Sequence, residues 1–354
     1  TDRADVIVSA TTDTGFARAE ALYGQTAAVV RYPLDFSGSV ARFLDAVRPD
    51  AVALTELELW PNFLSACARR GVPACVINGR LSVRSFANYH RFKRFVGPMF
   101  QRLEFAAVQD ADYAGRFEAM GVESARCLLT GSMKWDNARV GDGDGDAGDA
   151  LVRAMGLDRS RPIVVAGSTG PGEEAMLHEQ IGARCPEAQL VCAPRKPERF
   201  DEAAAAMPGC VRRSAHSEPV APVGGSRFVL DTIGELGALY SAADLVVVGR
   251  SFGDLYGSDP TEPIGLGKAT VIGPRVGDFE SIVAAFEAGG GIVRAGRDDV
   301  GSVVRGLLDD PGRRSELGER GLGVIRAHQG ASAMHAELIL GLVLGSAPSG
   351  FLSA

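Results

Sequence analysis

Short apolar runs alternate with helix-like segments along the whole chain, and this alternation constrains the fold more than any other feature. Runs such as Ala51–Leu54 and Ala74–Ile77 lack polar positions, as expected of strands buried on both faces. Segments such as Val40–Val47 place apolar residues three and four positions apart, which is typical of helices. A βαβα succession predicts mostly parallel sheets with helices on both faces, an α/β fold.

The length of 354 residues and the apolar content of 46% favour two domains. We expect two doubly wound Rossmann-like domains that face a central cleft. The chain opens almost directly on a strand, so the first strand of the N-terminal domain is expected to be missing. The predicted parts are an N-terminal domain over 1–140, a flexible linker over 141–150, a second domain over 151–330 and a C-terminal helix over 331–354.

The run Gly141–Asp149 alternates glycine with aspartate and could be a linker or a calcium loop. A calcium loop needs glycine at its sixth position and glutamate at its twelfth, but Ala147 and Arg153 stand there. We therefore interpret the run as an acidic interdomain linker.

Composition narrows the classes of function. A net charge of −7 argues against a general nucleic-acid binder, which needs a basic face. The six cysteines form no CxxC pair and the five histidines share no metal spacing, so we expect buried reduced thiols and neither a metal nor another cofactor. No apolar run is long enough to span a bilayer, and 338–344 is typical of a packed helix.

Loops after predicted strands of the second half are suited to an anionic ligand. Pro194 and Arg195 begin a stiff, basic loop that could hold a phosphate or carboxylate, although a solvated helix start is the alternative. Ile233, Gly234 and Glu235 follow another strand, where backbone groups at a helix start can bind a nucleotide. Glu235 could instead serve only as a helix N-terminal charge.

The segment Gly257–Pro263 is the most informative local motif. Glu262 lies one turn into a helix that starts near a proline, and from there it could accept hydrogen bonds from two ribose hydroxyls. The alternative is a capping box, with Asp259 as the N-cap and Glu262 as its partner. Pro260 and Thr261 complete the motif.

Two charged positions stand out in the first half. Glu56 and Glu58 follow a predicted strand, and residues two apart on an extended segment face the same side. Paired carboxylates can assist acid–base chemistry or hold hydroxyls, with an ordinary salt bridge as the alternative. Lys134 ends the first half and would place a cation at the mouth of the cleft.

These motifs occur in the order found in the Kdo (3-deoxy-D-manno-oct-2-ulosonic acid) transferase family, which the chain resembles over nearly its whole length. Each motif is weak alone, but their order and spacing are specific. The matching segments are Thr11–Gly15, Glu56–Asn62, Asn78–Ser82, Gly131–Asp136, Gly167–Thr169, Pro194–Arg195, Asp231–Leu236, Glu262–Pro263 and Gly273–Pro274.

The resemblance implies a two-domain (GT-B) glycosyltransferase that moves Kdo from CMP-Kdo to a lipid A precursor, lipid IVA, by metal-independent inversion. It implies work at the cytoplasmic face of the bacterial inner membrane, in peripheral or anchored contact with it. Glu56 and Lys134 would stabilise the transition state. The residues implied to bind CMP are Pro194 and Arg195 at the phosphate, Ile233, Gly234 and Glu235 as a backbone cradle, and Asp259, Pro260, Thr261 and Glu262 at the ribose.

The chain also departs from the family pattern. The general base of the family is a glutamate in a loop before the Thr11–Gly15 motif, and we expect that loop and an upstream membrane segment to be absent here. Gly170, Lys196 and the pair Ser258–Asp259 stand where the family usually has His, His and His-Asn. The alternatives are a GT-B transferase that uses a UDP- or GDP-sugar, and a non-catalytic nucleotide-binding remnant.

Overall fold

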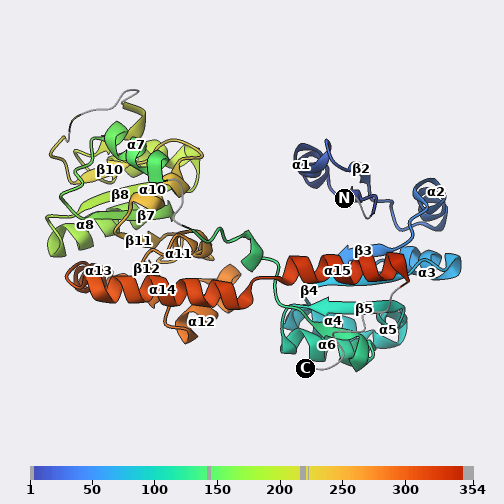
Figure 1. The fold of residues 1–354 in the computed structure, drawn as a ribbon. Coiled ribbons are helices and arrows are strands. Elements are labelled where there is room, and N and C mark those ends of the chain that lie inside the picture. The colour runs from blue at the N-terminus through green and yellow to red at the C-terminus, as the bar shows by residue number, and fades with distance from the viewer. Residues whose placement is uncertain (1–3, 142–144, 216–220, 222, 346–354) are drawn as a thin grey trace. The chain divides into compact units, whose positions relative to one another are not determined.

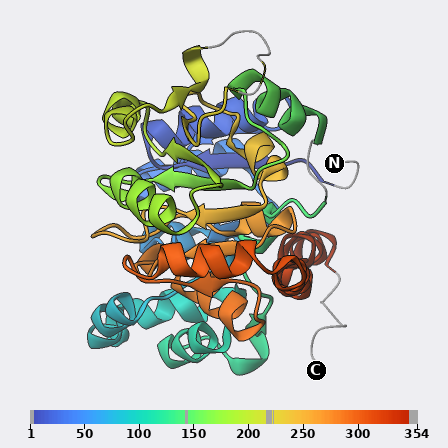
Figure 2. The same ribbon diagram turned by 90° about the vertical axis from the view of Figure 1, so that its left-hand side faces the viewer.

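A computed structural model describes residues 4–141, 145–215, 221 and 223–345. The chain forms two compact units, which are described separately below. Unit 1 comprises residues 1–136 together with 329–354, and unit 2 comprises residues 137–328. In both units parallel strands alternate with helices (Figures 1 and 2).

Unit 1 contains a four-stranded parallel sheet in the order β3-β4-β5-β6 and a separate parallel pair, β1-β2. One continuous sheet was expected, but neither β1 nor β2 pairs with β3 in the part of the chain that the structure describes. The elements are β1 (Ile7–Ala10), α1 (Asp13–Tyr23), β2 (Ala28–Arg31), α2 (Ser37–Val47), β3 (Val52–Thr55), α3 (Pro61–Arg70), β4 (Ala74–Gly79), α4 (Val83–Arg91), α5 (Lys93–Gln101), β5 (Leu103–Val108), α6 (Ala111–Met120), β6 (Cys127–Leu129) and α15 (Ala331–Leu344).

The C-terminal helix α15 belongs to unit 1 and covers one face of its four-stranded sheet. Successive strand residues point to opposite faces, so Val76 joins the main core while Cys75 packs with Leu338 of α15. Asp136 caps the start of α15, because its carboxylate accepts hydrogen bonds from the N–H groups of Gly330 and Ser332, each at 2.6 Å. The helix predicted over 331–354 is found as α15 over 331–344, and residues 346–354 of that prediction lie outside the described residues.

Unit 2 is built on a seven-stranded, wholly parallel sheet in the order β13-β12-β11-β7-β8-β10-β9. Its strands are β7 (Ile163–Thr169), β8 (Gln189–Pro194), β9 (Val211–Arg212), β10 (Arg227–Val229), β11 (Leu245–Val248), β12 (Thr270–Ile272) and β13 (Val293–Arg294). Its helices are α7 (Gly145–Met155), α8 (Glu173–Arg184), α9 (Phe200–Ala205), α10 (Leu236–Ala242), α11 (Thr261–Gly265), α12 (Glu280–Ala288), α13 (Val300–Leu308) and α14 (Pro311–His328).

The predicted linker differs from the structure over its second half. Residues 142–144 lie outside the described residues, but from Gly145 the chain is helical, as part of α7. Leu151 and Met155 are buried, which anchors the helix. Gly148 lies so close to α10 that an added Cβ would be 2.8 Å from the Ala238 carbonyl oxygen. Composition alone indicated a linker because packing against α10 is not visible in a local sequence.

Candidate functional site

The strand order in the sheet of unit 2 reverses at its centre, although all seven strands are parallel. From β7 the chain moves to β8, then to β9 at the edge and back to β10, and it then crosses to the other side of β7 as β11. Open α/β sheets bind ligands beyond the carboxyl ends of their strands at such a switch point. We call the four loops there the switch-point site, and they comprise residues 167–170, 194–199, 231–235 and 257–262.

A buried carboxylate joins the loop after β7 to the loop after β11. Glu173 is 1% exposed, and it accepts N–H hydrogen bonds from Gly170 at 2.8 Å, Arg250 at 2.6 Å and Phe252 at 2.9 Å. Three donors offset the cost of burying this charge. Ser168 and Arg250 have φ values of 55° and 58°, so strained backbone is held on both sides of the switch point.

A second buried carboxylate ties the loop after β7 to the loop after β8. Glu174 is 1% exposed and accepts two hydrogen bonds from Arg199, at 2.9 and 3.0 Å, and one from Thr169 Oγ1 at 2.6 Å. Hydrogen bonding to Glu174 raises the pKa of Arg199 above its usual value. The Thr169 carbonyl accepts the Arg195 N–H at 3.1 Å, so this network also fixes the predicted phosphate loop.

The predicted phosphate residues differ in exposure. Pro194 is buried as the last residue of β8, whereas the Arg195 side chain is exposed. No described residue forms an ion pair with Arg195, although Lys196 lies 3.6 Å from Glu198. Arg195 is therefore a cation available to an anion at the carboxyl edge of the sheet.

The loop after β10 begins with a carboxylate that is held from the neighbouring strand. Asp231 accepts hydrogen bonds from Arg212 Nε at 2.7 Å and from the Ser214 N–H at 2.8 Å. Burial alone raises the pKa of Asp231, but the bonds from Ser214 and Arg212 outweigh it and hold this pKa below its usual value. The loop thus starts from a fixed position.

The rest of this loop presents backbone and one apolar side chain. Glu235 accepts hydrogen bonds from the Thr232 hydroxyl and from Arg213 Nη2, so its carboxylate closes the loop. Gly234 has a φ of 91°, a conformation that suits glycine, and Ile233 is 70% exposed. Of the three predicted cradle residues, Ile233 and Gly234 face solvent, and Glu235 is partly buried in structural contacts.

Glu262 is placed beside the predicted cradle. An added Cβ on Gly237 would lie 2.7 Å from Glu262 Oε1, so this carboxylate reaches the first turn of α10. Asp259 accepts hydrogen bonds from the N–H and hydroxyl of Thr261, at 2.9 and 2.7 Å. These bonds stabilise the start of α11 and do not involve Glu262, so they are not the bonds of a capping box. Partial burial and the charge of Asp259 raise the pKa of Glu262, and Arg139 opposes this shift.

Two more residues of this loop are buried. Pro260 directly precedes α11, and Ser258 is 8% exposed. The Ser258 hydroxyl has no hydrogen-bond partner among the described residues. A buried hydroxyl without a partner is costly, which is a reason to expect a ligand or water beside it.

Glu56 and Lys134 lie in loops at the carboxyl edge of the sheet in unit 1, after the outer strands β3 and β6. Three inter-strand steps of about 4.8 Å separate the two strands by roughly 14 Å. Both loops are fastened to β4. The Glu56 N–H donates to the Ile77 carbonyl at 3.0 Å, and the Met133 N–H donates to Asn78 Oδ1 at 3.1 Å.

The expected pairing of Glu56 with Glu58 is wrong. It assumed an extended segment, but Glu56 has a φ of 57° and begins a turn. Glu58 instead accepts a hydrogen bond from Trp60 Nε1 at 3.0 Å. Glu56 therefore stands as a single, partly buried carboxylate.

Sequence reasoning did not assign a role to Asn78, Glu173, Glu174 or Arg199. Each of these side chains holds a loop at a carboxyl edge through a contact with residues distant in sequence. One signal was available: Glu173 and Glu174 are two acidic residues directly after a small-residue loop, at the start of a helix.

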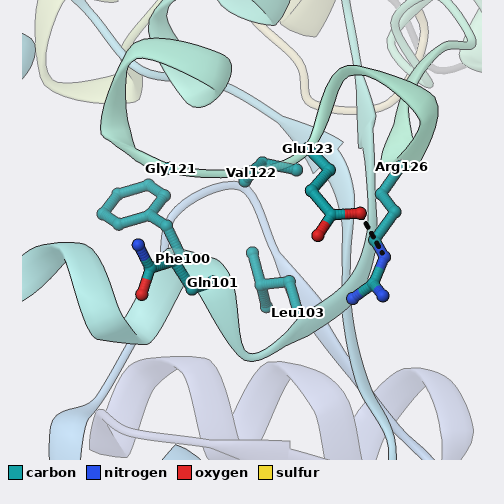
Figure 3. Close-up of a pocket in the computed structure, with 7 residues that line it drawn as sticks. All are labelled: Phe100, Gln101, Leu103, Gly121, Val122, Glu123 and Arg126. Carbon is teal, nitrogen blue, oxygen red and sulfur yellow. Dashed lines mark ion pairs between the residues drawn. The ribbon is translucent and has the colours of Figure 1, made fainter.

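A pocket in unit 1 has none of these loop residues in its lining (Figure 3). It is lined by the end of α5, the start of β5 and the segment after α6, where Glu123 and Arg126 form an ion pair at 3.4 Å. Because it adjoins the amino end of β5, it is at the sheet edge opposite to Glu56 and Lys134. Ligand sites of α/β sheets lie at the other edge, so we assign it no role.

Three further observations bear on the chemistry. Among the described residues, no cluster of three His, Cys, Asp or Glu side chains could hold a metal ion. All six cysteines are free thiols, and burial raises the pKa of Cys75 to about 12. Within the same described ranges, no helix is long and apolar enough to cross a membrane.

Comparison with known proteins gives sequence relatives over most of the chain. A family profile described as 3-deoxy-D-manno-octulosonic-acid transferase (kdotransferase) matches residues 1–137. The 3-deoxy-D-manno-octulosonic acid transferase of Bordetella pertussis is 32% identical over 347 residues, which are 92% of this chain and 78% of that protein. The protein of the same name from Haemophilus influenzae is 29% identical over 335 residues, 90% of this chain and 76% of that protein.

Solved structures show the fold. A glycosyltransferase from Rickettsia africae has a TM-score of 0.59 at 10% identity, and the match covers 96% of this chain and 90% of that one. This likeness confirms the predicted α/β fold of two Rossmann-like units, the GT-B type.

Proposed function

This chain belongs to the 3-deoxy-D-manno-octulosonic acid transferase family of glycosyltransferases, and we propose that it transfers Kdo from CMP-Kdo to lipid IVA. The proposed reaction is a direct, metal-independent displacement that inverts the anomeric carbon. The oxygen of the acceptor hydroxyl bonds to that carbon as the bond between the carbon and a phosphate oxygen of CMP breaks. The hydroxyl proton passes to a general base, which in the family is a glutamate in a loop before the Thr11–Gly15 motif.

The observation that carries the proposal is the gathering of four loops at the switch point of unit 2. Arg195 would bind the phosphate of CMP, with Pro194 shaping the loop. Ile233, Gly234 and Glu235 would form a backbone cradle for the nucleotide, with the Glu235 carboxylate closing it. Hydrogen bonds to an anion are stronger when donor groups are fixed in advance, and the Glu173 and Glu174 networks provide that rigidity.

The ribose would be held by the segment Asp259, Pro260, Thr261 and Glu262. The Glu262 carboxylate keeps solvent access beside the cradle, so it can accept hydrogen bonds from ribose hydroxyls. The unpartnered hydroxyl of Ser258 supports a polar ligand at this loop.

In unit 1, Glu56 and Lys134 would stabilise the transition state. Negative charge develops on the departing CMP, so a fixed cation such as Lys134 lowers the barrier. No described residue forms an ion pair with Lys134, so its charge is not already neutralised. We further propose that the enzyme works at the cytoplasmic face of the inner membrane, where its lipid acceptor would lie.

Calorimetric titration of CMP, UDP and GDP tests the nucleotide, and CMP release from CMP-Kdo with and without lipid IVA tests the reaction. We expect selective CMP binding and acceptor-dependent release that EDTA does not change. A preference for UDP or GDP would overturn the proposed donor. CMP binding without release, measured with a chain that also carries the loop before Thr11–Gly15, would instead indicate a non-catalytic nucleotide-binding protein.

A further inference from the structure

The loop that carries Lys134 is held at its far end by the start of α15. Asp136 accepts the backbone hydrogen bonds that cap this helix, and the Trp135 carbonyl accepts a hydrogen bond from Gln329 Nε2 at 3.2 Å. Trp135 is 5% exposed, so the residue next to Lys134 is fixed in the interior of unit 1. The helix itself packs against β4 (Figure 1). The docking of α15 thus determines where this loop ends.

A buried histidine of the same helix holds the other end of the loop. Thr130 directly follows β6, and its Oγ1 lies 2.8 Å from Nε2 of His335, which is 205 positions further along the chain. His335 is 1% exposed and Thr130 is 9% exposed. The Thr130 hydroxyl also donates to the Val108 carbonyl at 3.3 Å. Nε2 of a neutral His335 therefore carries the ring proton and donates it to Thr130.

The second ring nitrogen of His335 indicates a role beyond packing. Nδ1 is buried and has no hydrogen-bond partner among the described residues. A buried acceptor without a partner is costly, whereas an apolar side chain at this position would avoid that cost. Burial lowers the pKa of His335 and the charge of Asp136 opposes this shift, so the ring is neutral at pH 7. The bond to Thr130 is what an apolar residue could not supply.

We propose that His335 is a positioning residue for Lys134, the proposed transition-state cation. Asn78 holds the middle of the loop, and α15 supplies the anchors at its two ends through Thr130 and Asp136. A charge lowers a barrier only when it is fixed where charge develops in the transition state, and small displacements of such a group are costly. The proposal rests on the proposed function, because His335 acts through the Lys134 loop.

The fluorescence of Trp135 reports the position of the loop without any need for catalysis. The chain has two tryptophans, so Trp60→Phe leaves Trp135 as the single one. In this background His335→Leu should raise the acrylamide quenching constant of Trp135 by at least about twofold, because a loop that loses an anchor opens to solvent. Thr130→Val removes the same bond from its other side and should have the same effect. Unchanged quenching in both variants would overturn the proposal.

Matched controls separate the hydrogen bond from the packing of the helix. His335→Gln keeps an amide N–H that can donate to Thr130, so it should show the quenching of the unsubstituted protein. Leu338→Ala removes an apolar contact between α15 and the sheet, so it should lower the melting temperature without raising the quenching. Equal quenching in Leu338→Ala and His335→Leu would assign the effect to helix packing and contradict the proposal.

A double-mutant cycle tests whether His335 acts through Lys134. The measured rate is CMP release from CMP-Kdo with lipid IVA, by a chain that also carries the loop before Thr11–Gly15. His335→Leu should lower turnover by at least about fivefold at unchanged CMP affinity, and by no further factor in a Lys134→Ala background. The same loss in both backgrounds would show that His335 acts independently of Lys134, against the proposal. Failure of the proposed function is distinct, because it appears as a wild type without acceptor-dependent release.

Discussion

The side chain of Asn78 accepts a hydrogen bond from the Met133 N–H at 3.1 Å, which fastens the loop of Lys134 to the end of β4. The neighbouring Ile77 carbonyl accepts the Glu56 N–H at 3.0 Å. Two successive residues of one strand thus set the positions of both proposed catalytic residues. The geometry of the acceptor side depends on a residue that contacts neither substrate in our proposal.

Asn78→Gly should lower turnover by about tenfold or more while CMP affinity stays unchanged, because the Lys134 loop loses its anchor. Glycine tolerates the φ of 51° at this position, so the loss reports the missing acceptor rather than backbone strain. Asn78→Asp keeps an acceptor oxygen and serves as the matched control. Steady-state kinetics and calorimetry measure the two effects, and wild-type turnover in Asn78→Gly would refute the positioning role.

Lys134→Ala should lower turnover more than it lowers donor affinity, because a transition-state contact is lost rather than a ground-state one. Lys134→Arg retains the charge and should recover part of the rate. The comparison is between single-turnover rates and the dissociation constant for CMP-Kdo. An equal loss in both quantities would assign Lys134 to donor binding instead.

Glu262→Ala should weaken CMP binding by about 1–3 kcal/mol, because the ribose hydroxyls lose a charged acceptor. Glu262→Gln keeps the shape and one acceptor oxygen, so its loss should be smaller. Glu179→Gln removes an exposed carboxylate elsewhere in unit 2 and should leave the titration unchanged. Calorimetric titration with CMP measures the affinity of each variant. Unchanged affinity in Glu262→Ala would show that Glu262 does not bind the ribose.

Arg199→Ala should lower the free energy of unfolding by about 3–5 kcal/mol, because it leaves the buried Glu174 carboxylate without its partner. Glu202→Ala removes the exposed partner of the same arginine and should cost at most about 1 kcal/mol. Urea denaturation followed by circular dichroism gives both values. Similar losses of unfolding free energy in the two variants would contradict a larger contribution of the buried Arg199–Glu174 pair to stability.

Stability should fall when the pH drops below about 6.5, the ordinary pKa of histidine. Burial lowers the pKa of His335, and the charge of Asp136 opposes this only partly. The unfolded chain then binds a proton more readily than the folded chain. The free energy of unfolding therefore falls as the pH drops from about 6.5 to the folded pKa, and His335 does not change it above about pH 6.5. His335→Gln should reduce this slope in urea titrations, and an identical slope would contradict the assignment.

The local sequence was sufficient for the α/β class and for the alternation of strands with helices, because buried parallel strands and amphipathic helices have distinct periodicities. It also indicated the loops at 194–199 and 231–235, since each follows an apolar run directly, and the segment 257–262 through its own motif. It did not predict the break between β2 and β3, or helix α7 over 145–155. Both features depend on packing between segments that are distant in the sequence.

What the sequence alone determined is the alternation of strands and helices, the loop motifs at strand ends and, through their order, the resemblance to Kdo transferases. Only the tertiary structure decided that α15 returns to unit 1, that Glu56 stands apart from Glu58, and that Asn78, Glu174 and Arg199 hold the loops. The physical reason is the separation along the sequence of the residues that interact. Secondary structure follows from periodicity over a few residues, whereas the contacts of Arg199 with Glu174, Met133 with Asn78 and Ser332 with Asp136 join residues 25, 55 and 196 positions apart.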